Sequence, residues 1–182
     1  MAKLPLITQK SQVPPEGHRA FDSIAASRGS VHGPFTMFMH YPAGAERVAH
    51  LGALVRFEGP LDMRVRAICG MVVAREFEAM YIWGAQTGGG RKLGVPEATI
   101  DAIRANHSRG ASPEDAQIID ATRMLLRKHR LDDTTRQGLL DRFGGPSGLV
   151  ELTTVIGYYT MLAQTVNACE LEAADGAEVL KV

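Results

Sequence analysis

The sequence predicts an all-α protein, a bundle of six to eight helices, and three observations support this fold class. Apolar residues recur at spacings of three and four, which is the period of a helix with one buried face. Several of these segments begin or end at residues that favour helix termini, such as Ser112-Pro113 and Gly94. No segment of convincing length alternates apolar and polar residues as a half-buried strand would.

The first half of the chain is expected to hold an arm, a loop and four helices. Residues 1–15 alternate Pro, Gln, Ser and Lys without a period, which indicates an arm that is loose or docked on a neighbour. The loop at residues 33–42 carries several large side chains, so we expect it to pack over the core or to line a pocket. The helices are expected at residues 17–30, 43–57, 61–75 and 76–93, the last one ending at Gly94.

The second half is expected to contain four more helical segments, most with a clear start signal. Ser112 is placed as an N-cap, Pro113 follows at the first helical position, and acids occupy the positive first turn. Asp132 caps a shorter helix, and Pro146 begins a long apolar one. These segments cover residues 96–106, 112–130, 132–143 and 146–166.

Composition narrows the classes of function. The length of 182 residues is typical of one domain, which we expect at residues 16–182. The 20 basic residues balance the 20 acidic ones, and this balance argues against nucleic acid or an anionic membrane surface as a partner. The amino end lacks a secretory pattern and no run is long enough to cross a bilayer, so a cytoplasmic location is expected. Cys69 and Cys169 lie 100 positions apart, outside any dithiol or metal spacing, and are expected to be free thiols. No metal or other cofactor is expected.

A set of residues in the middle of the chain forms a recognisable pattern. Leu61, Arg64 and Arg66 are followed by Val72-Val73-Ala74-Arg75, Tyr81-x-Trp83, Leu93-Gly94-Val95 and Ile100-Asp101-Ala102-Ile103. This pattern resembles the carboxymuconolactone decarboxylase family, relatives of the AhpD-type alkylhydroperoxidases, in outline from about Phe21 to about Glu170. The resemblance implies an AhpD-like helical fold, a small-molecule ligand and a homo-oligomer, often a trimer or hexamer.

The chain departs from that family where the chemistry is done. The resemblance places the family's three proton carriers at Ala67, Ile82 and Gln86, none of which titrates usefully. The redox branch carries Cys-x-x-Cys at the positions of Ala79 and Ile82. Both usual chemistries are therefore missing at their usual positions, and Gln86 is left as an oxyanion stabiliser at best.

Three nearby groups are candidates to replace the missing ones. Glu78 and His40 join Gln86 as candidate catalytic residues, although an acid in a first helical turn and a His among apolar residues also have ordinary structural roles. Arg75 can anchor a substrate carboxylate or make an ordinary ion pair. The remaining candidate substrate-binding residues are Tyr81, Trp83, Ile82, Ala67 and Tyr158, for which packing in the core or an interface is the alternative.

Four glycines weaken the segment expected to form the 76–93 helix. At about 1 kcal/mol each relative to Ala, Gly84 and Gly88-Gly89-Gly90 cost the helix roughly 3 to 4 kcal/mol. Three explanations stay open: a close backbone approach, a cavity that admits a large ligand, or a break in the helix that frees backbone N–H groups.

Three functions follow from this pattern. The first is a divergent carboxymuconolactone-decarboxylase-like lyase or isomerase that acts on a small carboxylated or lactone-type metabolite. The second is a non-catalytic, oligomeric ligand-binding or structural protein, since all three titrating positions are lost. The third is alkylhydroperoxidase-like redox chemistry, which requires a reactive thiol pair.

Overall fold

The computed structural model describes residues 3–180, and these residues form helices joined by short loops without any β-strand. The all-α prediction is therefore confirmed for this part of the chain. Residues 1–2 of the expected arm and 181–182 of the expected domain lie outside the described residues. The elements are η1 Lys10–Gln12, η2 Pro15–Gly17, α1 His18–Arg28, α2 Phe35–Phe38, α3 Pro42–Ala53, η3 Leu54–Glu58, α4 Met63–Glu76, α5 Met80–Lys92, α6 Glu97–Arg104, α7 Pro113–Lys128, α8 Asp133–Arg142 and α9 Pro146–Ala168.

The described chain has nine α-helices, one more than the upper expectation. The additional one is α2, a four-residue helix inside the aromatic loop at 33–42. Its turn is too short to show a helical period in sequence, and it forms because Phe35 and Met37 are buried there. The loop does pack over the core, as its large side chains indicated.

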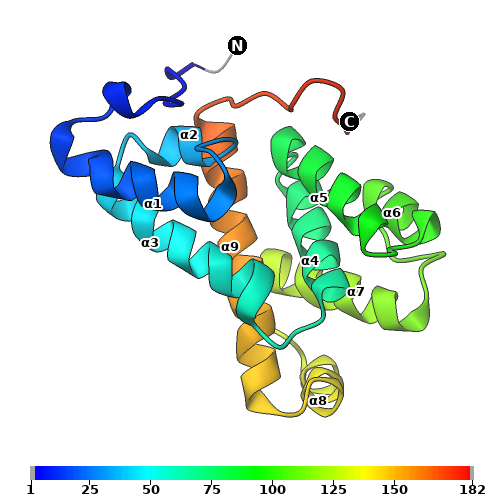
Figure 1. Cartoon of the computed structure of the whole chain (residues 1–182). Coiled ribbons are helices and arrows are strands. Elements are labelled where there is room, and N and C mark those ends of the chain that lie inside the picture. The colour runs from blue at the N-terminus through cyan, green and yellow to red at the C-terminus, as the bar shows by residue number, and fades with distance from the viewer. Residues whose placement is uncertain (1–2, 181–182) are drawn as a thin grey trace.

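Helix α4 is the centre of the fold. It packs against α5, α7 and α9, and all its residues from Val65 to Ala74 are buried. In Figure 1, α4 to α7 lie on one side of the long α9, while α1 and α3 form a layer on the other side. A second apolar cluster holds that layer together, and Ile7 and Val13 of the amino-terminal segment are buried in it.

Local signals place several helix ends where the sequence indicated. The Ser112 hydroxyl accepts a hydrogen bond from the Asp115 N–H at 3.2 Å, and the Asp132 carboxylate caps α8 through the Thr135 N–H at 2.7 Å. Gly94, just after α5, has a positive φ of 76°, which favours glycine. Among the described residues, no helix combines the length and apolar character needed to span a membrane.

The chain beyond α9 returns across the bundle as an extended segment, residues 169–180, which we call the C-terminal strap. Figure 1 shows the strap running from the end of α9 to α5, beside the amino-terminal segment. The Lys3 N–H donates to the Cys169 carbonyl at 3.2 Å, and Leu180 is buried in the main core. The strap passes over α5 at Gly84, where an added Cβ atom would lie 2.8 Å from the Ala177 Cβ.

Candidate functional site

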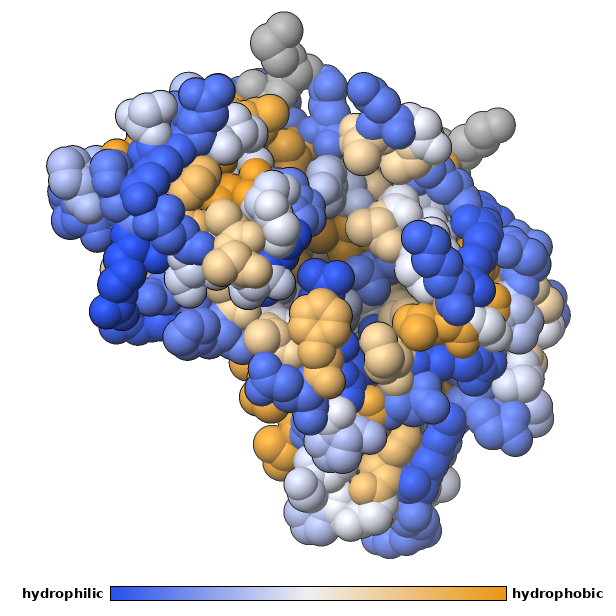
Figure 2. Space-filling view, viewed as in Figure 1, coloured by the Kyte–Doolittle hydropathy of each residue, from blue (hydrophilic) through white to orange (hydrophobic). Residues whose placement is uncertain are grey.

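A cleft opens between α5 on one side and α1 and η3 on the other, with α9 at its base. Its two lobes share the wall residues Arg56, Ala85, Gln86 and Tyr159. We call the larger one, of about 280 Å³, the Ala67 lobe, and the smaller one, of about 160 Å³, the Tyr158 lobe. Figure 2 shows this face of the molecule hollowed between the two layers, with hydrophobic residues beside hydrophilic ones at the rim.

The two lobes differ in what lines them besides the shared wall. The Ala67 lobe is completed by Phe57, Met63, Arg66, Ala67, Gly89, Lys92 and Leu93. The Tyr158 lobe is completed by Arg28, His32, Pro34, Phe35, Tyr81, Ile82, Tyr158 and Leu162.

Gln86 lies at the junction of the two lobes because the facing helix leaves room for it. A Cβ atom at Gly70 of α4 would come within 2.8 Å of the Gln86 Oε1, so the glycine lets the amide pack against α4 in this position. Burial raises the pKa of the Tyr159 phenol, and a hydrogen bond with the Gln86 side chain acts in the opposite direction. The amide is therefore held at the centre of the cleft, where it can bind a carbonyl or an oxyanion.

Two neighbouring tyrosines of α9 supply neutral hydroxyl groups. The rings of Tyr158 and Tyr159 meet edge to face with centroids 5.5 Å apart. Burial raises the pKa of both phenols, that of Tyr159 to about 12. Both hydroxyl groups consequently stay protonated near neutral pH and can donate hydrogen bonds to a ligand.

The cleft is basic. Its walls contain the cationic side chains of Arg28, Arg56, Arg66 and Lys92, and none of the residues of 3–180 that line the two lobes carries a carboxylate. Within the same range, neither Arg28 nor Arg56 has a carboxylate at ion-pair distance. A small anion is the ligand whose charge this lining complements.

Arg28 is a partly buried cation of the cleft without a carboxylate partner among the described residues. Its guanidinium lies over the Phe35 ring, 4.3 Å from the centroid, and donates to the Ala49 carbonyl at 3.1 Å. Burial lowers the pKa of Arg28, and the nearby Tyr158 hydroxyl offsets only part of that effect. A bound anion would restore the electrostatic stabilisation that this desolvated cation has lost from water.

Arg66 is the most deeply buried cation of the cleft, with an exposed fraction of 4%. Its guanidinium donates to the Val55 carbonyl at 3.0 Å and to the Gly59 carbonyl, and it lies 3.5 Å from the Glu151 carboxylate. Its Nε is buried and has no hydrogen-bond partner among the described residues. Arg66 thus holds η3 in place and keeps one donor unused.

The structure brings only part of the predicted site together. Five of the nine candidates line the cleft, and these are Gln86, Tyr81, Ile82, Ala67 and Tyr158. The other four, Glu78, His40, Arg75 and Trp83, do not line either lobe.

The two other candidate catalytic residues point to solvent. Glu78 lies in the turn between α4 and α5 with a positive φ of 50°, and its side chain is 55% exposed, 3.9 Å from the Arg75 guanidinium. It is not in the first turn of α5, because α4 continues to Glu76 and α5 begins only at Met80. His40 is exposed, and its Nε2 lies 2.9 Å from the Pro5 carbonyl. Neither side chain therefore lines the cleft.

Arg75, near the end of α4, and Trp83 of α5 lie outside the cleft and have structural roles. The Arg75 Nε donates to the Arg104 carbonyl at 2.8 Å. Trp83 is fully buried, with the Arg104 guanidinium 5.7 Å from its ring centroid. Each helical residue turns by about 100°, so Ile82 and Gln86 face the cleft while Trp83 faces away from it.

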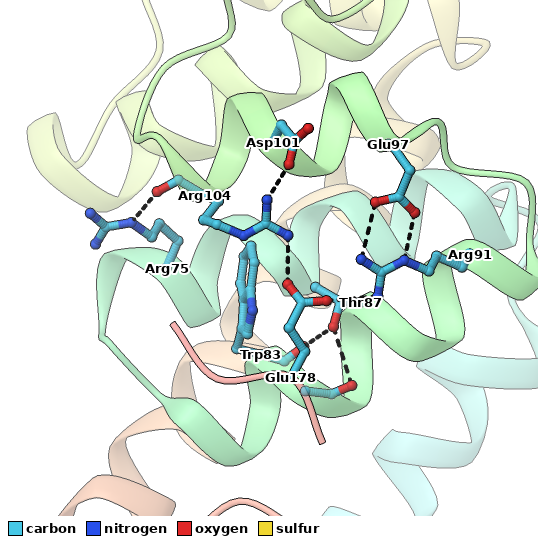
Figure 3. A network of polar contacts seen from close by, with 9 residues as sticks. Arg75, Trp83, Thr87, Arg91, Glu97, Asp101, Arg104 and Glu178 are labelled. Carbon is cyan, nitrogen blue, oxygen red and sulfur yellow. Dashed lines mark hydrogen bonds and ion pairs between the residues drawn. The ribbon is translucent and has the colours of Figure 1, made fainter. Parts of the chain in front are cut away.

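The strap closes that far side of α5 through one carboxylate. Figure 3 shows Glu178 between two arginines, with its carboxylate 2.5 Å from Arg104 and 2.7 Å from Arg91. Partial burial alone would raise the pKa of Glu178, but the hydrogen bonds from the two arginines outweigh it and hold the pKa below the ordinary glutamate value. Trp83 lies beneath Arg104 in the same network.

The candidates named from the sequence did not include the cations Arg28, Arg56, Arg66 and Lys92 or the phenol Tyr159. Tyr159 adjoins Tyr158, which was predicted. Arg28 and Arg56 come from the ends of α1 and of η3, and no local pattern relates them.

No family model and no curated protein matches the sequence. The fold does match solved structures. One is the crystal structure of an alkylhydroperoxidase AhpD core, an uncharacterized peroxidase-related protein from Ralstonia eutropha JMP134, with a TM-score of 0.77, 12% sequence identity, and coverage of 96% of this chain and 93% of that one. Another is an uncharacterized peroxidase-related protein from Silicibacter sp. TM1040, with a TM-score of 0.73, 15% identity, and coverage of 97% and 93%. The chain therefore has the all-α fold of the AhpD core.

Proposed function

We propose that the protein binds a small carboxylated or lactone-type metabolite in the cleft around Gln86 and acts on it as a lyase or isomerase. The observation that carries this proposal is the lining itself, in which cationic groups, two protonated phenols and one amide meet without a carboxylate. Such a lining stabilises negative charge on a ligand, and more so when charge builds up on a carbonyl oxygen during reaction.

The groups of the cleft suit a reaction that passes through an enolate. In a decarboxylation, the bond to the departing carboxylate breaks and its electron pair moves onto the neighbouring carbonyl, which becomes an enolate. Arg56 and the Gln86 amide are placed to stabilise that oxygen, and the Tyr159 hydroxyl is placed to return a proton to carbon. Water would then reprotonate the tyrosine. An isomerisation would also need a base to take the first proton from carbon, and the His32 imidazole in the lining of the Tyr158 lobe is the group that could accept it.

A second candidate function is non-catalytic binding of the same ligand. It is favoured by the position of Glu78 and His40, which leaves the cleft without a carboxylate base and with His32 as its single imidazole among the described lining residues. The resemblance also predicts a homo-oligomer, a trimer or hexamer, and light scattering of the purified protein tests that prediction.

Cys69 does not supply the reactive thiol that the redox alternative requires. The similar structures include peroxidase-related proteins, but here Cys69 is fully buried, and burial raises the pKa of its thiol to about 12. The Thr122 hydroxyl lies 3.6 Å from its sulfur and lowers the pKa only partly. A thiol in this state is a poor nucleophile.

The test is incubation of the purified protein with carboxymuconolactone and related enol-lactones, followed by chromatography of products and calorimetry of binding. Conversion that falls at least about 100-fold in Tyr159→Phe, with binding retained, supports the lyase or isomerase. Binding without conversion favours the second candidate. Neither binding nor conversion contradicts both, and peroxide consumption that requires Cys69 would establish the redox alternative instead.

A further inference from the structure

The Ala67 lobe is a hollow formed by the absence of side chains. Its walls include Ala67 of α4 and, one turn apart on α5, Ala85 and Gly89. A Cβ atom built on Gly89 would meet no other atom within 4 Å, so the space beside this glycine is open. A larger residue at this position would extend into the lobe without a clash.

Apolar side chains surround this hollow although they are exposed to solvent. Phe57 is 61% exposed, Met63 47% and Leu93 37%, and all three line the Ala67 lobe. Large apolar groups gathered at one opening are typical of a surface that binds an apolar partner or ligand. The hollow therefore offers apolar contact area on several sides.

The same lobe contains cationic and amide groups that can face an anion. Arg66 lines it but is 4% exposed, and its guanidinium already donates to the Val55 and Gly59 carbonyls beside the Glu151 carboxylate. Arg56 and Gln86 form the wall that the Ala67 lobe shares with the Tyr158 lobe. A ligand that fills the hollow thus has cationic and amide donors within reach at its inner end.

We propose that the Ala67 lobe binds the apolar ring or chain of an amphipathic carboxylate, and that Gly89 sets the size of the group that fits. This proposal rests on the proposed function, and it adds that the ligand is an acid with a bulky apolar body rather than a compact diacid. The volume of this lobe is about 280 Å³ and that of the other lobe is about 160 Å³. These volumes place the cleft in the size range of small-molecule sites.

Gly88 provides a matched control. It precedes Gly89 in α5, and a Cβ atom on it would also meet nothing within 4 Å, but it does not line the cleft. Leucine at either position replaces a helical glycine by a good helix former. Only leucine at position 89 reduces the volume of the lobe.

The experiment is calorimetric titration of the wild-type protein, Gly89→Leu and Gly88→Leu with succinate, benzoate and 2-naphthoate. The wild-type protein should bind 2-naphthoate at least about tenfold more tightly than succinate, because 2-naphthoate buries an apolar ring system that succinate lacks. Gly89→Leu should weaken 2-naphthoate by at least about tenfold while benzoate changes by less than about threefold. Gly88→Leu should leave all affinities unchanged.

Two results overturn the inference and are distinguishable from each other. If the acids bind but with equal affinity, or if both leucine variants weaken 2-naphthoate equally, the apolar hollow is not the binding feature and the proposed function stands. If none of the three acids binds the wild-type protein, the carboxylate site itself is refuted, together with the inference.

Discussion

Two glycines of α5 are expected to respond to the same substitution with opposite sign. A Cβ atom at Gly84 would lie 2.8 Å from the Ala177 Cβ and 3.1 Å from the Glu178 carbonyl oxygen, because the strap passes directly over this position. A Cβ atom at Gly88, one turn later, would meet nothing within 4 Å. Gly84→Ala must therefore displace the strap, whereas Gly88→Ala has open space.

The magnitudes follow from what each change gains and loses. Replacing a glycine inside a helix by alanine stabilises it by about 1 kcal/mol at either position. Displacing the strap forfeits the ion pairs of Glu178, worth about 1 kcal/mol, and part of the burial of Leu180, which is worth about 1.5 to 3 kcal/mol when complete. We expect Gly88→Ala to raise the free energy of unfolding by about 1 kcal/mol, and Gly84→Ala to lower it by about 1 kcal/mol.

Thermal unfolding followed by circular dichroism measures this difference. About 2 kcal/mol between the two variants corresponds to roughly 4 to 8 °C in Tm for a chain of this size. Adding Ala177→Gly to Gly84→Ala removes the nearest contact and should recover part of the loss. Equal stabilisation by both alanines would refute the placement of the strap on Gly84.

The remaining predictions concern charge, ligand binding and thiol reactivity. The folded-state pKa of Glu178 lies below its unfolded value, so its ion pairs stabilise the protein above about pH 4.3 and are lost as the pH falls through the folded-state pKa. The stability difference between the wild-type protein and Glu178→Gln, read by fluorescence of the single tryptophan, Trp83, should therefore shrink as the pH falls below about 4.3. Arg56→Gln should weaken 2-naphthoate at least about tenfold and flatten the salt dependence of binding, as calorimetry at two ionic strengths would show. Titration with a thiol reagent should modify Cys169 quickly and the buried Cys69 only on unfolding, so Cys69→Ser should leave the fast phase unchanged.

The fold could be predicted largely from capping and helix-stop residues, because a helix end depends on residues that are close in sequence. The caps at Ser112 and Asp132 and the stop at Gly94 each involve atoms within a few positions in the chain. The sequence left three explanations for the glycines of this helix, and the structure excludes a break, because α5 runs continuously from Met80 to Lys92. Gly84 serves a close approach, although by the strap and not by a helix, and Gly89 opens a cavity.

The sequence indicated lining residues of the cleft most directly where the geometry of one helix relates them. The spacing of Ile82 and Gln86 places both on one face of α5, and both line the cleft. The partner groups come from distant parts of the chain: Arg28 ends α1 and Arg56 lies in η3, and tertiary packing alone brings them to Gln86. The position of His40 outside the cleft could not be read from the sequence, because the direction in which a loop residue points is set by its neighbours in space, here the Pro5 carbonyl.

The crystal structure of the protein with 2-naphthoate bound tests the central claim most directly. The account predicts the carboxylate within hydrogen-bond distance of Gln86 and of at least one of Arg28, Arg56 and Arg66, with the ring system against Gly89. A ligand found elsewhere, or a cleft that stays empty at saturating concentrations, would contradict it.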